Sequence, residues 1–143
     1  MTTSHASAVW EGKLKDGKGQ FAAGSGAFSG NYTFATRFEG ASGTTPEELI
    51  AAAHAACISM ALSAGLEKSG TPATRIETRA ACTIDMVGGG PKITTMELVI
   101  RGKVPGIDQA AFQEAAEAAK DGCPVSGALK GNVQFKLDAR LET

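Results

Sequence analysis

Apolar and polar residues alternate along three stretches in the second half of the chain, a pattern typical of strands with one buried face. The stretches are residues 74–86, 92–104 and 132–141. Their predicted inward residues are Ile76, Thr78, Ala80, Cys82, Ile84 and Met86; then Met96, Leu98 and Ile100; then Val133, Phe135, Leu137, Ala139 and Leu141. The glycine-rich sequence GGGP at 88–91 predicts a turn between the first two strands.

The first forty residues also predict strands and turns. Residues 7–14 and 19–23 flank the sequence KDGKG, in which Asp16-Gly17 favours a hairpin turn. Residues 31–39 alternate as well, and they predict a strand with Arg37 facing away from the aromatic side chains. The face opposite Arg37 carries Tyr32, Phe34, Thr36 and Phe38.

A long helix is predicted between Thr45 and Gly70. Thr45 suits the N-cap, Pro46 the first helical position and Glu48 the third, which together form a capping-box pattern. Gly70 suits a C-terminal cap. Because the segment carries almost no charge between Glu48 and Glu67, we expect the helix to be buried on most sides.

A second helix is predicted after Asp108, with an apolar stripe on one side. The stripe consists of Phe112, Ala115, Ala116 and Ala119. A short element then begins at the sequence CPVSGALK, residues 123–130. Together these patterns predict one α+β domain over residues 1–143, with mainly antiparallel sheet.

Charge and composition narrow the possible functions. The chain has 143 residues and a net charge of −1, so it has no broad basic surface for nucleic acid or anionic membrane. We expect no membrane-spanning run and no signal peptide, and therefore a cytoplasmic protein with reduced thiols. The cysteine and histidine spacings match no metal site, and no phosphate-binding glycine motif occurs.

The three cysteines have different settings. Cys82 lies on the apolar face of a predicted strand, which favours a packing role. Cys123 precedes Pro124 at the start of a short helical turn, where the helix N-terminus lowers the pKa of a thiol and the turn keeps it near the surface. The sequence leaves open whether Cys123 is reactive or merely tolerated there.

Cys57 lies in the middle of the long helix, in the sequence AAAHAAC. A buried thiol without help has a raised pKa and is inert, so a reactive Cys57 needs a cation from outside the helix. His54 lies one turn earlier and allows a Cys-His nucleophile pair. No orienting third residue or oxyanion hole is evident, and the pattern favours a core histidine bonded to backbone.

Several motifs resemble the osmotically inducible protein C (OsmC) family, in its osmotically inducible branch. They are TRFEG, GTTPEELIAAAHAACISMAL, VPGID and GCPVSGALK, and the resemblance runs from WEGKLKDGKG to the last strand. It implies a thiol peroxidase that reduces organic hydroperoxides, and hydrogen peroxide more weakly, without a bound cofactor. It also implies that Cys57 is the peroxidatic thiol, Cys123 the resolving thiol, and Arg37 and Glu47 their charged neighbours.

The same resemblance implies an intertwined homodimer in which sheets from both subunits enclose two long helices. The implied reductant is a dithiol, such as the lipoylated proteins of the hydroperoxide-resistance branch. Ten residues separate Glu47 from Cys57, about 15 Å along a helix. One chain therefore cannot bring them together, whereas two antiparallel helices crossing near 51–53 can. A redox sensor, or a small-ligand-binding dimer without turnover, remains the alternative.

Overall fold

The computed structural model describes residues 1–142, which form two compact units, Met1–Pro46 and the remainder from Glu47 onward. The N-terminal unit contains an antiparallel sheet of β1 (Ala6–Glu11), β2 (Lys18–Ala23) and β3 (Ser29–Tyr32), in that order. The predicted turn at Asp16-Gly17 lies in the loop between β1 and β2. Gly19 lies against the rings of Trp10 and Tyr32, where an added Cβ would overlap both.

The prediction of a strand over residues 31–39 is wrong beyond Tyr32. The chain instead forms the short helix α1 (Phe34–Phe38). Thr33 and Thr36 exchange side-chain and backbone hydrogen bonds at the helix start, in a complete capping box. The rings of Phe34 and Phe38, one turn apart, have centroids 5.0 Å apart. Positions 34 and 38 share a face in a strand and in a helix alike, so alternation alone does not distinguish the two.

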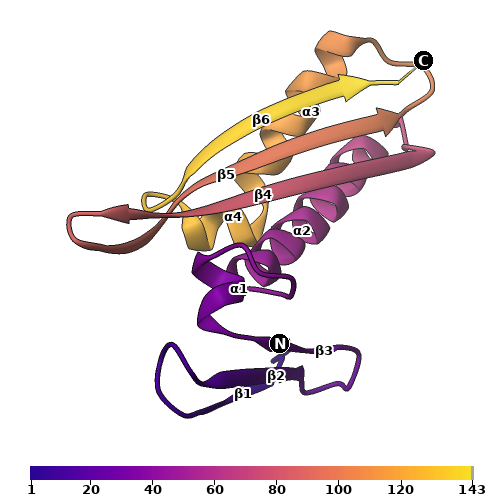
Figure 1. The fold of residues 1–143 in the computed structure, drawn as a ribbon. Coiled ribbons are helices and arrows are strands. Elements are labelled where there is room, and N and C mark those ends of the chain that lie inside the picture. Colours follow the sequence, from indigo (N-terminus) through magenta and orange to yellow (C-terminus); the bar gives the residue numbers. More distant parts are fainter. Residues whose placement is uncertain (143) are drawn as a thin grey trace. The chain divides into compact units, whose positions relative to one another are not determined.

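The C-terminal unit is a three-stranded sheet with helices on one face (Figure 1). The strands are β4 (Arg75–Val87), β5 (Gly90–Lys103) and β6 (Gln134–Leu141), in the order β4-β5-β6. Strands β4 and β5 form an antiparallel hairpin through the predicted glycine turn, where Gly88 and Gly89 both have positive φ. Strand β6 is parallel to β5. The helices are α2 (Pro46–Lys68), α3 (Gln109–Gly122) and α4 (Pro124–Leu129).

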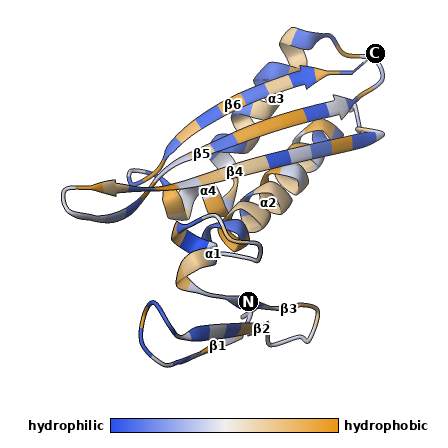
Figure 2. Cartoon of the chain, in the orientation of Figure 1, coloured by the Kyte–Doolittle hydropathy of each residue, from blue (hydrophilic) through white to orange (hydrophobic). Residues whose placement is uncertain are grey.

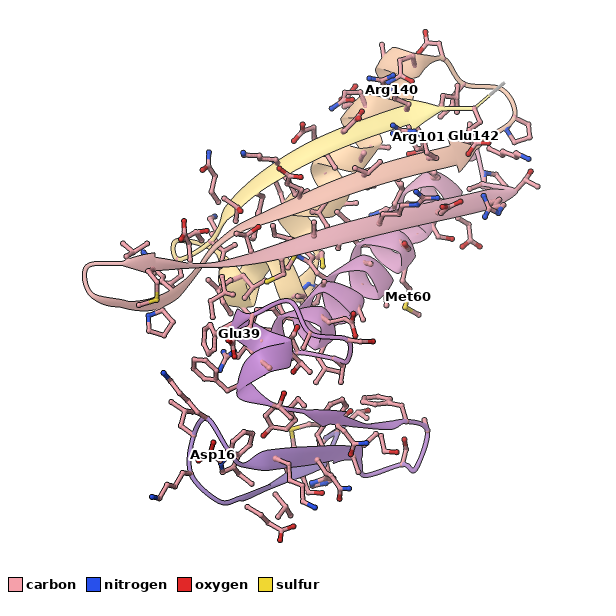
Figure 3. The ribbon with its side chains drawn as sticks, viewed as in Figure 1. Asp16, Glu39, Met60, Arg101, Arg140 and Glu142 are labelled. Atoms are coloured by element: carbon pink, nitrogen blue, oxygen red, sulfur yellow. The ribbon has the colours of Figure 1, made fainter. Side chains whose placement is uncertain are left out.

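The predicted core positions face the helices. Met96, Leu98 and Ile100 of β5 are fully buried, and so are Ile58 and Leu62 of α2. The opposite face of the sheet carries ion pairs, among them Arg101–Asp138 and Arg140–Asp138, and Figure 3 labels both arginines on β5 and β6. The one-sided pattern is therefore confirmed for β5, whereas the prediction that Met86 faces inward is wrong, because it lies near the end of the β4–β5 hairpin and is 64% exposed.

Helix α2 begins and ends where the sequence predicts. It starts at Pro46, and Gly70 follows its last turn with a φ of +81°, while the Thr71 N–H donates to the Leu66 carbonyl over 2.9 Å. Only one face is buried, however, which corrects the expectation of burial on most sides. The buried residues are Glu47, Ala51, His54, Ile58, Leu62 and Leu66.

The other face of α2 is apolar and exposed within the chain. Met60, which is 77% exposed, points away from the sheet in Figure 3, and Figure 2 shows the helix as predominantly hydrophobic along its length. By length and composition α2 would be able to cross a membrane, contrary to the sequence expectation. Because Ile58, Leu62 and Leu66 pack on the sheet, we assign α2 to the core of the fold.

Candidate functional site

Two cysteines that lie 66 residues apart in the sequence meet where α2 passes the junction of α3 and α4. The Sγ atoms of Cys57 and Cys123 are 2.8 Å apart, and both thiols are free. This separation allows the two sulfurs to share a proton, and it is less than 1 Å longer than a disulfide bond of about 2.05 Å. The two sulfurs are therefore close enough to form a disulfide.

Cys123 is held at this point by two helices at once. It is the C-cap of α3, donating its N–H to Ala119, and the N-cap of α4, accepting from the N–H of Gly127. Helix α3 is fixed on the sheet by Phe112, Ala116 and Ala119, and Pro124 starts α4 as predicted. Cys123 is only 1% exposed, so the prediction that it lies near the surface is wrong, because α2 covers the turn.

Burial separates the roles of the two sulfurs. Cys57 is partly exposed, whereas Cys123 is enclosed. An incoming reagent therefore reaches Cys57 first. A product formed on Cys57 then lies next to a second thiol that solvent does not reach.

The two thiols also differ in acidity. Burial raises the pKa of Cys57, the hydrogen bond with Cys123 raises it further, and the N–H of Val125 acts in the opposite direction. Burial raises the pKa of Cys123 too, but the hydrogen bond with Cys57 and the hydrogen-bonding groups of Ser126 and Val125 outweigh it, so that pKa is lowered. Within the pair, the pKa of Cys123 is therefore the lower of the two. The sequence argument that Cys57 needs an outside cation agrees with this result.

His54 is fully buried, but its hydrogen bond is with neither Cys57 nor backbone. Its Nε2 lies 2.7 Å from the Oγ of Ser126, and its ring packs edge-on against Phe135. Burial lowers the pKa of His54, which favours a neutral ring. Both sequence readings of His54, the Cys-His pair and the backbone-bonded core residue, are therefore corrected.

Ser126 is a residue that the sequence reasoning missed. It is 2% exposed and lies at the third position of α4. The signal was available, because the third helical position faces the N-cap residue, and Pro124 already marked Cys123 as that cap.

The two predicted charged neighbours lie in different units. Arg37 is on α1 of the N-terminal unit, with its guanidinium over the ring of Phe38 at 5.3 Å. Glu47 is in the first turn of α2 and is 4% exposed, and its charge contributes to raising the pKa of Cys82. Since α2 is continuous, Glu47 and Cys57 of one chain remain about 15 Å apart along the helix.

Cys82 is not part of the thiol pair. It lies on β4, partly buried and packed against the core, and burial is the main cause that raises its pKa. This agrees with the packing role predicted for it.

A groove runs between α2 and α3. It has a volume of about 660 Å³. Ala61, one turn after Cys57, and Gly122, directly before Cys123, line one part of it, and Ile107 and Thr71 line another. Most of the lining side chains are small or apolar, so the groove suits an uncharged hydrocarbon group.

Comparison with known proteins places the chain in a family. The model of the OsmC-like protein family matches residues 39–138. Peroxiredoxin OsmC of Escherichia coli is 47% identical over 137 residues, covering 95% of this chain and 94% of the relative. The organic hydroperoxide resistance protein OhrB of Bacillus subtilis is 38% identical over 103 residues, covering 71% and 74%.

Solved structures agree with the sequence matches. The crystal structure of Bacillus subtilis OhrB has a TM-score of 0.72 at 29% identity, covering 95% of this chain and 98% of that one. A structure of an OsmC protein from Legionella pneumophila has a TM-score of 0.75 at 21% identity and covers 98% of both chains, which supports the fold alone. The α+β fold class and the family resemblance are thus confirmed, and the chain belongs to the OsmC-like family.

Proposed function

We propose that this protein is a thiol peroxidase that reduces organic hydroperoxides, and hydrogen peroxide more weakly, in a reducing cytoplasm. The observation that carries the proposal is the 2.8 Å contact between a partly exposed Cys57 and an enclosed Cys123. The names of the relatives, a peroxiredoxin and an organic hydroperoxide resistance protein, support the same redox chemistry.

The reaction follows from the two sulfurs. The Cys57 thiolate attacks the terminal oxygen of the hydroperoxide, the O–O bond breaks, and the alkoxide takes a proton and leaves as the alcohol. Cys57 becomes a sulfenic acid. The Cys123 sulfur attacks that sulfenic acid, water leaves, and a disulfide forms. An external dithiol then reduces the disulfide and returns both thiols, so the cycle needs no bound cofactor.

Cys57 must be ionised for the first step, and the residues around the pair keep its pKa raised. We assign Arg37 to this task, because a guanidinium stays charged and presents several fixed donors to a thiolate. Glu47 would orient that guanidinium through a bidentate ion pair. The proton on Cys57 then has a nearby acceptor, because the Cys123 sulfur is 2.8 Å away.

The groove between α2 and α3 would favour organic peroxides over hydrogen peroxide. An alkyl or aryl group lying against Ala61 and Ala115 would leave its peroxide end near Cys57. Hydrogen peroxide gains no such contact.

Steady turnover tests the proposal against a redox sensor or a non-catalytic binding dimer. With dithiothreitol supplied, the protein should consume many equivalents of cumene hydroperoxide per chain, and hydrogen peroxide more slowly. A sensor would stop after one equivalent until it was slowly reduced, and a binding dimer would consume none. Either result, measured by peroxide assay over time, would contradict the enzyme.

We further propose a homodimer with shared sites. The exposed face of α2 carries small side chains at Ala52, Ala53 and Ala56, beside Met60. A second α2 crossing antiparallel at these alanines would bring each Glu47 level with the other chain's Cys57. The same crossing would cover the apolar face that one chain leaves exposed.

A single cysteine at position 52 reports this crossing. In a chain whose three native cysteines are serines, Ala52→Cys should form a disulfide-linked dimer under mild oxidation, because the two copies would face each other near the twofold axis. Ala81→Cys, an exposed alanine on β4, is the matched control and should couple far less. If the two variants couple equally, or position 52 never couples, the shared-site arrangement is wrong.

A further inference from the structure

The hydrogen bond between His54 and Ser126 is the buried polar contact that the proposed reaction leaves unused. His54 is 0% and Ser126 2% exposed, and their Nε2 and Oγ atoms are 2.7 Å apart. Burying two polar side chains costs stability unless they are hydrogen-bonded, and an apolar pair would fill the space more cheaply. Packing alone therefore does not explain why His54 and Ser126 occupy these positions.

The position of the pair suggests that reason. His54 is one helical turn before Cys57 on α2, and Ser126 is at the third position of α4, whose N-cap is Cys123. A side chain at the third helical position lies beside the N-cap residue. The Ser126 hydroxyl thus contacts the His54 ring and also forms a hydrogen bond with the Cys123 sulfur.

We infer that hydrogen bonds are donated from His54 to Ser126 and from Ser126 to Cys123. The Nδ1 atom of His54 has no partner among residues 1–142. A buried N–H without an acceptor is rarer than an acceptor without a donor, so we assign the ring proton to Nε2, where it is donated to Ser126 Oγ. The Ser126 hydroxyl proton is then left to point at the Cys123 sulfur.

We propose that His54 and Ser126 are positioning residues that hold the Cys123 sulfur ionised and aimed at Cys57, so that it attacks the oxidised Cys57. This inference rests on the proposed peroxidase cycle for its purpose. It goes beyond that cycle in assigning two residues to the resolving step.

The chemistry of that step shows what the pair contributes. Cys123 loses its proton, its sulfur attacks the Cys57 sulfur, and the S–O bond of the sulfenic acid breaks. The departing hydroxide takes up one proton, so the balance is one sulfenic acid and one thiol giving one disulfide and one water. A donor chain from His54 through Ser126 to Cys123 supplies hydrogen bonding to the thiolate that must form first.

Other groups near Cys123 do not replace this effect. On α3, Lys120 lies one turn before Cys123 but is ion-paired with Glu117 at 2.8 Å. On α2, Cys57 contacts Cys123 at 2.8 Å, and on β6 the ring of Phe135 against His54 carries no charge. The lowered pKa of Cys123, to which both the hydroxyl and the backbone of Ser126 contribute, agrees with the proposal.

A thiolate titration tests the proposal without peroxide. In the Cys57→Ser, Cys82→Ser protein, Cys123 is the remaining thiol, and its ionisation is followed by ultraviolet absorbance as pH is raised. Adding Ser126→Ala or His54→Leu should move the midpoint upward by roughly one pH unit, a tenfold effect typical of one hydrogen bond to a charge. His54→Gln, whose amide can donate from nearly the same place as Nε2, should keep the midpoint close to that of the parent.

The control is Ser59→Ala on the same helix. It removes a hydroxyl that donates to Thr78 Oγ1 of β4 over the same 2.7 Å, and it should leave the midpoint in place. An unchanged midpoint in Ser126→Ala and His54→Leu, or an equal shift in Ser59→Ala, overturns the proposal. In chains with all native cysteines, the first two variants should also accumulate sulfenic acid, detected by mass after one equivalent of cumene hydroperoxide. If the titration shifts as expected but no chain forms either sulfenic acid or the Cys57–Cys123 disulfide, the peroxidase function fails while the positioning effect stands.

Discussion

Replacing Cys57 with serine should abolish hydroperoxide consumption, lowering the rate at least ~1,000-fold, as loss of a nucleophile does in other enzymes. A serine hydroxyl ionises far above neutral pH and cannot cycle through a sulfenic acid. The remaining thiol of the pair, Cys123, is 1% exposed and so is shielded from an organic hydroperoxide. The measurement is the initial rate of cumene hydroperoxide loss with excess dithiothreitol.

Replacing Cys123 with serine should have a different signature. Cys57 should still be oxidised once, but its sulfenic acid would have no adjacent thiol and would progress to sulfinic acid with further peroxide. Mass spectrometry after one and after several equivalents distinguishes the disulfide of the wild type from the sulfinic acid of the variant. Cys82→Ser, which alters a partly buried thiol on β4, is the matched control and should behave as wild type.

If the two serine variants gave the opposite results, Cys123 would be the peroxidatic thiol and Cys57 the resolving thiol. In the C-terminal unit, Cys123 has the lowered and Cys57 the raised pKa. If Cys123→Ser lost the first oxidation and Cys57→Ser kept it, acidity rather than access would decide which sulfur attacks. Our assignment depends on exposure of Cys57 and on a cation reaching it.

The sequence predicts those parts of the fold in which the residues at helix ends and the alternation along strands match the observed burial. Helix α2 carries a proline at its start and a glycine after its end, and the buried β5 residues Met96, Leu98 and Ile100 alternate with less buried neighbours. Each of these signals lies within a few residues of the feature that it determines. The prediction of a strand at residues 34–38 was wrong because the spacing of Phe34 and Phe38 suits a strand and a helix equally.

The site was predictable only in part, for a physical reason. Sequence motifs identified Cys57 and Cys123 as candidates, but the burial of Cys123 depends on α2 covering the turn between α3 and α4. The bond from His54 to Ser126 likewise joins residues 72 positions apart. Contacts of this kind arise from packing of helices on the sheet, which periodicity does not report.

Phe112 is the side chain on which that packing should depend most. It is fully buried on α3, and its ring occupies the space above Gly102 of β5, where an added Cβ would overlap it. Phe112→Ala should reduce the free energy of unfolding by about 3–5 kcal/mol, the usual cost of the lost burial and the cavity. Gly102→Ala should reduce it by about 1–3 kcal/mol, because the new methyl group pushes against the ring.

The two changes should not add. In the double variant, the methyl group at position 102 enters the space that the ring has left, so the combined loss should be smaller than the sum of the two single losses. Urea unfolding at one fixed protein concentration, under reducing conditions, measures all four proteins. Glu114→Ala, an exposed position on the same helix, is the control and should change stability by less than about 0.5 kcal/mol.

The same variants test whether packing of α3 on the sheet affects disulfide formation between Cys57 and Cys123. Helix α3 ends at Cys123, so loosening its contact with the sheet should lower the yield of the Cys57–Cys123 disulfide after one equivalent of hydroperoxide. Gly102→Ala should lower that yield in the fraction that remains folded. Strictly additive losses of stability would show that Phe112 and Gly102 are not in contact, and an unchanged disulfide yield would show that the α3–sheet contact does not place Cys123.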